Sequence, residues 1–189
     1  NILEQNARAG IMLQALDYGT AGFNVAGNTI SKSVNDADAS TLGDGIVVAL
    51  KQDLSTVESI GLFAESVIDS NSIGVDDGGN AGNGIQFAMA ERTRIQDLRV
   101  TNNVFLNNTF DGFNFSRSAD AYLNSLVIEK NRATNNRGDG FDLFTKNTIK
   151  DELDFFINEN IIDNNEQYGI RMQLDADARA FVQFDRNSV

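Results

Sequence analysis

The chain has 189 residues and a net charge of −12, and it contains no histidine, cysteine or proline. Without histidine and cysteine it has no Ser-His-Asp or Cys-His catalytic site, no disulfide and no thiolate metal site. The negative charge repels nucleic acids and anionic membranes, and no apolar run approaches the roughly 18 residues of a membrane-spanning helix. Acidity favours solubility and oxygen-ligated cations such as Ca²⁺. We therefore expect neither a nucleic-acid partner nor membrane insertion.

A repeat runs along the chain, because an asparagine is followed nine residues later by a glycine in four places. These pairs are Asn1 and Gly10, Asn103 and Gly112, Asn131 and Gly140, and Asn160 and Gly169. Two further units, Asn28 to Gly45 and Ser66 to Gly84, have similar ends with extra residues between them. The last three units begin 28 and 29 residues apart, and a fixed period of this size predicts stacked repeats.

Each unit contains alternating apolar residues before its asparagine and after its glycine, and one more apolar or small residue between the two. Such alternation over short runs predicts three short, half-buried strands per unit, with a turn of positive φ at the glycine. In chain order the alternating pairs are Ile11 and Leu13, Phe23 and Val25, Ile46 and Val48, Gly61 and Phe63 (in the Ser66 unit), Ile85 and Phe87, Leu98 and Val100, Phe113 and Phe115, Leu126 and Ile128, Phe141 and Leu143, Phe155 and Ile157, Ile170 and Met172, and Val182 and Phe184.

Equivalent strands of successive units can pair if the chain winds as a coil, with each strand about 4.8 Å above the one before it. The pairing is then parallel, with right-handed crossovers, and Phe113 stacks on Phe141 and Ile128 on Ile157. Asparagine also recurs five residues after the first position of the units, and we expect it to form a ladder of stacked side chains at a bend. Its members are Asn6, Asn71, Asn108, Asn136 and Asn165, with Ser33 as the exception.

Taken together, the pattern resembles the parallel β-helix repeat of the pectin-lyase-like superfamily. The best match is 126–143, which reads LVIEKNRATNNRGDGFDL, and the resemblance covers essentially the whole chain. It implies an all-β, right-handed parallel β-helix of about six coils of roughly 28 residues, with two loop insertions. The superfamily includes polysaccharide lyases and hydrolases, phage tailspikes and large secreted or surface-anchored bacterial proteins, so the fold alone does not decide the function.

Two acidic insertions, 34–44 and 72–83, are the first candidate site. They enter adjacent coils, so we expect them to project together from one edge and to be the most mobile part of the chain. Asp36, Asp38, Asp76 and Asp77 are carboxylates suited to Ca²⁺. No contiguous calcium-binding motif is present, so flexible solvated loops are the alternative interpretation.

The residue before each glycine is the second candidate. These residues are Ala9, Asp44, Asn83, Asp111, Asp139 and Tyr168. In the predicted register Asp111 and Asp139 stack about 5 Å apart. A carboxylate pair can act as the acid and nucleophile of a glycoside hydrolase. Aspartate before glycine is also explained by turns in which the carboxylate bonds its own backbone, without any chemistry.

A lyase site is the third candidate, because polysaccharide lyases of this superfamily combine acidic calcium ligands with a Lys or Arg base. The available cations are Arg92, Arg94, Lys130, Arg132 and Lys146. No two of them share a clear register beside a carboxylate cluster. We expect ordinary ion pairs instead, between Lys130 and Glu159 and between Asp142 and Arg171.

These patterns favour a structural or binding segment of a secreted or cell-surface protein, located outside the cell. The alternative is a carbohydrate-active enzyme, a polysaccharide lyase or a glycoside hydrolase, or a fragment of one, with a polysaccharide as its partner. Neither end of the chain carries a predicted cap. We therefore expect 1–189 to be one segment of a longer solenoid, with further coils or neighbouring chains docked at both ends.

Overall fold

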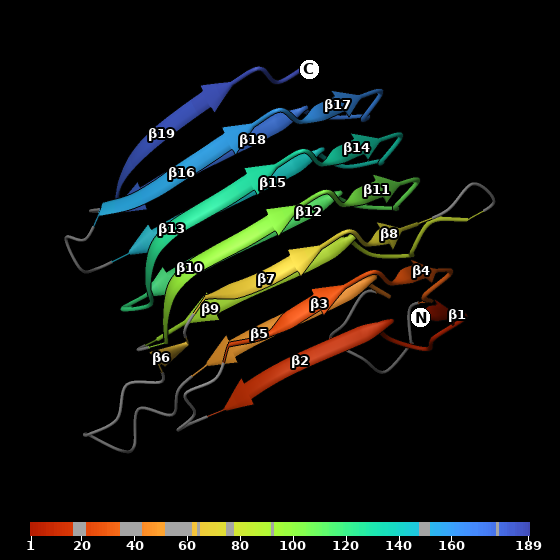
Figure 1. Cartoon of the computed structure of the whole chain (residues 1–189), viewed down its shortest axis with the longest axis horizontal. Coiled ribbons are helices and arrows are strands. Elements are labelled where there is room, and N and C mark those ends of the chain that lie inside the picture. Colours follow the sequence, from red (N-terminus) through yellow and green to blue (C-terminus); the bar gives the residue numbers. More distant parts are fainter. Residues whose placement is uncertain are drawn as a thin grey trace.

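The computed structural model shows a parallel β-solenoid of about five turns, built from three sheets (Figure 1). It describes residues 1–16, 22–34, 43–51, 62–63, 65–74, 78–91, 93–147, 152–176 and 178–189. These residues contain strands and turns but no helix, and hence none that is long and apolar enough to span a membrane. The predicted all-β solenoid with parallel pairing is confirmed.

Sheet A has the shortest strands, each of two or three residues. It consists of β1 (Ile2–Glu4), β4 (Thr29–Ser31), β8 (Ser72–Ile73), β11 (Val104–Leu106), β14 (Arg132–Thr134) and β17 (Ile161–Asp163). Their order in the sheet follows their order in the chain, and every pair is parallel. One coil therefore lies on the next, as the successive colours of Figure 1 show.

Sheets B and C form the rest of each coil, and most of their strands are longer. Sheet B consists of β2 (Ile11–Leu16), β5 (Ile46–Lys51), β9 (Ile85–Ala90), β12 (Phe113–Ala119), β15 (Phe141–Asn147) and β18 (Ile170–Ala176). Sheet C consists of β3 (Asn24–Ala26), β7 (Ser66–Asp69), β10 (Arg94–Thr101), β13 (Tyr122–Glu129), β16 (Glu152–Asn158) and β19 (Arg179–Asp185), with β6 (Leu62–Phe63) also pairing with β10.

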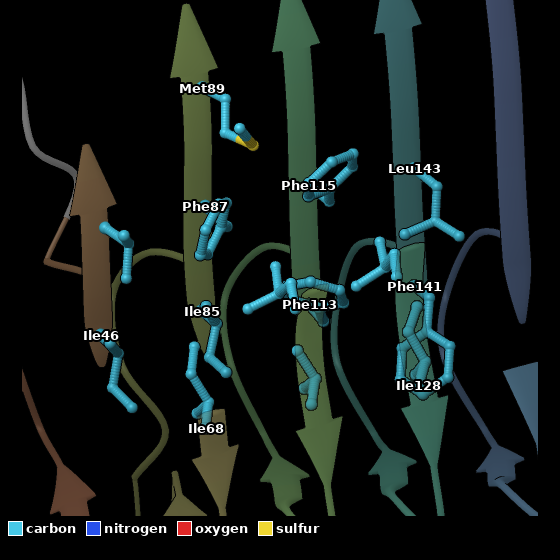
Figure 2. Packing of buried hydrophobic residues seen from close by; sticks show 14 of the residues in the cluster. Ile46, Ile68, Ile85, Phe87, Met89, Phe113, Phe115, Ile128, Phe141 and Leu143 are labelled. Atoms are coloured by element: carbon cyan, nitrogen blue, oxygen red, sulfur yellow. The ribbon is translucent and has the colours of Figure 1, made fainter. Parts of the chain in front are cut away.

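The core lies between the three sheets and is made of inward-facing side chains stacked in columns (Figure 2). Phe113 pairs with Phe141 and Ile128 with Ile157, as predicted, and Phe115 pairs with Leu143. Phe87 and Phe115 lie in neighbouring strands with ring centroids 5.8 Å apart. Each fully buried side chain of this size stabilises the fold by roughly 1.5–3 kcal/mol. The stacked core therefore ties every coil to its neighbours.

The bend between sheets C and A holds a ladder that the sequence analysis did not foresee, made by the repeat's first asparagine. Its members are Asn1, Asn28, Asn71, Asn103, Asn131, Asn160 and Asn187. Each side-chain amide donates to the side-chain oxygen of the next coil's asparagine over 2.9–3.1 Å. The residue before each buried rung adopts positive φ, as in Lys130 (57°) before Asn131. These bonds satisfy polar groups that the bend buries.

The asparagine ladder that was predicted from the sequence is the second ladder, at the bend between sheets A and B. It is confirmed between Asn108, Asn136 and Asn165. The prediction for the Ser66 unit is wrong. In this unit Asn71 belongs to the first ladder, and Asn80 occupies the second. Ser66 is therefore not a ladder residue but a residue of β7 that pairs with Leu98 of β10. The error arises because Ser66 and Asn71 are five residues apart, which is also the separation of the two ladder positions in other units.

This shift in register also corrects the predicted geometry of the insertions. Asn80 stacks next to Ser33, and the backbone N–H of Ser33 donates to the side-chain oxygen of Asn80 over 3.1 Å. The first insertion therefore interrupts its coil after Ser33, whereas the second interrupts its coil between Ile73 and Asn80. They therefore do not share one register. The predicted common projection and mobility of the insertions concern 35–42 and 75–77, which lie outside the described residues.

The recurrence of glycine at this position of the repeat has a different cause from the predicted positive φ. Positive φ among glycines is confined to Gly27, Gly43, Gly74 and Gly78 in the described residues. A Cβ on Gly112 would lie 2.7 Å from the carbonyl oxygen of Gly140 in the next coil. The repeat glycine is required because adjacent coils approach each other too closely there for any side chain.

Candidate functional site

A column of acidic and amide side chains runs along the position before the repeat glycine. The side-chain oxygen of each member accepts a hydrogen bond from the backbone N–H of the next coil: Asp44 from Asn83 (2.6 Å), Asn83 from Asp111 (3.0 Å), Asp111 from Asp139 (2.7 Å) and Asp139 from Tyr168 (2.9 Å). The structure thus brings Asp111 and Asp139 together, as predicted. The backbone N–H groups that bond these carboxylates belong to the neighbouring coil and not to their own turn, so the explanation by bonds to their own backbone is wrong.

A second polar row lies beside this column, on the outer face of sheet B. Gln86, Asn114, Asp142 and Arg171 occupy one register on β9, β12, β15 and β18. Asn114 donates to Asp111 (2.8 Å) and to Asp142 (3.2 Å), which links the two rows. Arg171 donates to both oxygens of Asp142, over 3.0 and 2.7 Å, as a bidentate pair. The predicted pairing of Asp142 with Arg171 is confirmed.

Asp111, Asp139, Asp142 and Arg171 together form what we name the Asp139 cluster. The Asp139 side chain is completely buried, and Arg171 lies over it with Nε 2.9 Å from Oδ2. The Nε–H of Arg171 points to Asp142, so Asp139 Oδ2 has an ion pair but makes no hydrogen bond. Three carboxylates therefore share a single guanidinium.

Burial raises the pKa of Asp139 above its ordinary value, because water no longer solvates the ionised form. The backbone N–H of Tyr168 and the charge of Arg171 oppose this change, whereas Asp111 and Asp142 add to it. The hydrogen bonds to Asp142 raise the pKa of Arg171, which stays protonated. The cluster is thus an electrostatically perturbed site of the kind that also occurs in active sites.

The surroundings of the cluster include exposed aromatic side chains. Phe110 precedes Asp111 and is 42% exposed, and Tyr168 follows Asp139 in the column and is 59% exposed. Aromatic rings beside carboxylates are useful for binding sugars. However, Asp139 has no exposed surface, so a substrate reaches it only if the side chain of Arg171 moves away.

The proposed calcium ligands Asp36, Asp38, Asp76 and Asp77 lie outside the described residues. Within the residues that the structure does describe, no group of three or more acidic side chains is arranged to hold a metal ion. The calcium hypothesis for the insertions therefore stays a prediction.

The candidate cations of a lyase site do not converge. Arg92 lies outside the described residues. Lys130 pairs with Glu129 (2.9 Å) and Glu159 (3.8 Å) at a bend, and the latter pair was predicted. Lys146 pairs with Asp175 on sheet B, and Arg132 donates to Thr134 on sheet A. Arg94 lies on sheet C. These four residues lie on different parts of the solenoid.

Arg94 contributes instead to a depression of about 310 Å³ on the outer face of sheet C, with Gln96, Tyr122 and Asn124. Its guanidinium lies 5.8 Å from the centre of the Tyr122 ring, a cation–π contact. The alternation of β10 and β13 is interrupted here, so two successive residues of each strand lie outside the core. Such interruptions are frequent near binding sites. The depression presents an aromatic ring, a cation and two amides at one surface.

No family model matches this chain, and no curated protein or solved structure matches it either. The functional interpretation therefore depends on the residues and their geometry.

The acidic column was predicted from the sequence, but the burial of Asp139 and the role of Arg171 as its cover were not. The signal was present, because Asp142 and Arg171 share a register and Asp139 lies three residues before Asp142. The depression was not predicted either, because the interruption of alternation in two neighbouring strands becomes visible only when the coils are aligned.

Proposed function

We propose that this chain is a structural or binding β-solenoid segment of a secreted or cell-surface protein. The observation that carries this proposal is the use of the acidic side chains. Asp111 and Asp139 each hold the backbone of the next coil, and Asp142 is bound by Arg171 through both oxygens. Side chains engaged in this way stabilise a stack and leave no exposed acid and base pair in the cluster.

The repeat's resemblance to the pectin-lyase-like superfamily supports an extracellular location, since many of its members are secreted or surface-anchored. We propose a polysaccharide as the bound partner. The depression around Tyr122 supports this, because a ring with amide donors and acceptors complements the apolar face and hydroxyl groups of a sugar. Inward-facing but exposed side chains of the last coil, such as Leu174 and Phe184, are suited to contact further coils or neighbouring chains.

The binding proposal is tested by titrating the protein with a panel of neutral and acidic oligosaccharides, using intrinsic tyrosine fluorescence and calorimetry. We expect saturable binding that is weakened at least tenfold in Tyr122→Ala. Phe181→Ala is the matched control, because it removes an exposed aromatic side chain of β19 that does not line the depression. Binding that is lost equally in both variants, or absent from the whole panel, would contradict the proposal.

A second candidate function is carbohydrate cleavage, which the raised pKa of Asp139 and the neighbouring aromatic side chains favour. A hydrolase releases reducing ends from a polysaccharide, and a lyase releases unsaturated products from a polyuronide. We expect neither product from this chain. Release that Asp142→Asn abolishes without loss of folding would replace the structural proposal with the enzymatic one.

A further inference from the structure

We propose that the Asp139 cluster is a proton-binding site that stabilises the contact between the coils of β15 and β18 as the pH falls. The site lies between two coils. On one side Asp139 and Asp142 belong to the coil of β15, and on the other the N–H of Tyr168 and the guanidinium of Arg171 belong to the coil of β18. Any change in the charge of Asp139 therefore changes the stability of the contact between these coils.

The charges around Asp139 do not balance when all its neighbours are ionised. Asp111 approaches from the coil of β12, Asp142 lies on β15, and Arg171 on β18 supplies the positive charge. The remaining polar neighbours, Asn114 and the backbone of Tyr168, are uncharged. Three negative charges beside one positive charge, at a position without solvent, favour the uptake of one proton.

The direction of the effect on stability follows from linkage. The pKa of Asp139 is raised in the folded protein, so the folded state binds the proton more tightly than the unfolded chain does. The contribution of this proton to stability is fully present below the unfolded pKa, and it is lost as the pH rises through the folded pKa. Acidification from neutral pH thus strengthens this contact, whereas an aspartate with a lowered pKa would weaken it.

Protonation leaves the bond to the neighbouring coil intact. The side-chain oxygen of Asn83, a neutral amide at the same column position, accepts the N–H of Asp111 over 3.0 Å. A neutral Asp139 can accept the N–H of Tyr168 in the same way, and it no longer repels Asp111 and Asp142. Arg171 remains held by Asp142 through two hydrogen bonds.

The experiment follows the side-chain carboxyl carbon of Asp139 by NMR between pH 7 and pH 3 in the folded protein. We expect it to titrate above the ordinary aspartate value of 3.8. In Asp111→Asn, which removes a neighbouring negative charge at a column position where Asn83 shows that an amide keeps the bond to the next coil, we expect the midpoint to move to lower pH. A midpoint at or below 3.8 in the wild type, or an unchanged or higher midpoint in Asp111→Asn, would overturn the proposal.

Urea unfolding over the same pH range gives the second, independent readout. We expect the wild type to gain stability relative to Asp139→Asn as the pH falls, because the variant carries a neutral side chain at every pH. Asp163→Asn, which removes an exposed carboxylate of β17, controls for the loss of one charge. Parallel stability curves for the wild type and Asp139→Asn, or a relative loss in acid, would count against the proton site.

Discussion

Ser33→Asn is predicted to stabilise the solenoid by completing the second asparagine ladder. Ser33 is almost fully buried, and neither its hydroxyl nor the side-chain amide nitrogen of Asn6 in the preceding coil makes a hydrogen bond. The serine side chain is too short to bridge two coils. The backbone is already suitable, since Lys32 has φ 56° and Asn107, which precedes the ladder member Asn108, has φ 57°.

The expected gain follows from the intact rungs. Asn108 accepts the amide of Asn80 over 2.9 Å and donates to Asn136 over 2.9 Å. An asparagine at position 33 would likewise accept from Asn6 and donate to Asn80, which adds two side-chain bonds. At about 1 kcal/mol for each bond, less the entropy of fixing a longer side chain, the net gain is about 1–2 kcal/mol. For a chain of this size that corresponds to a rise of about 3–6 °C in melting temperature.

Thermal and urea unfolding followed by circular dichroism measure this gain. Ser33→Ala is the matched control, because it removes the hydroxyl without supplying an amide, and we expect it to change stability by less than about 0.5 kcal/mol. If Ser33→Asn is no more stable than Ser33→Ala, the ladder does not stabilise this bend and the reasoning from its hydrogen bonds is wrong.

Three further perturbations test other features of the fold. Asn136→Ala removes a buried rung that bonds both neighbouring coils, so it should lower the melting temperature by about 6–15 °C. This decrease should exceed that of Asn187→Ala in the last coil, and equal effects would argue against the ladder. Gly112→Ala should destabilise the protein by at least about 2 kcal/mol in urea unfolding, because its Cβ meets the backbone of the next coil. Gly27→Ala should cost only about 1 kcal/mol, because Gly27 has φ 66° but open space around it. The reverse order would refute the steric explanation. Calcium should raise the melting temperature if the acidic insertions bind it, and a titration without heat or stabilisation would remove that hypothesis.

The repeat made most of the fold predictable, because alternation places a side chain inside or outside and the period places equivalent side chains on each other. The pairing of Phe113 with Phe141 required nothing more. The register failed in the coil of Ser66, where the insertion precedes the second ladder position and a nearby Asn71 offered a false match. Local spacing cannot distinguish these alternatives, whereas the hydrogen bonds between coils can.

The candidate site was predictable in its residues but not in its chemistry. The column of Asp111 and Asp139 follows from the period alone. Whether a stacked carboxylate faces solvent, its own turn or the next coil depends on backbone direction at the bend, which residue type does not reveal. The burial of Asp139 depends in addition on the conformation of Arg171 in another coil, so its pKa could not be foreseen.

The equivalence of the asparagine rungs has a consequence for how such a chain changes length. Deleting residues 103–130 would join Asn102 directly to Asn131, and Asn71 would then meet Asn131 as it now meets Asn103. Asn80 would meet Asn136, and Ile85 would stack on Phe141. Every hydrogen-bonded column would close again without a new contact type. Recombination between neighbouring repeats in the gene can therefore add or remove whole coils while the remaining ones keep their structure.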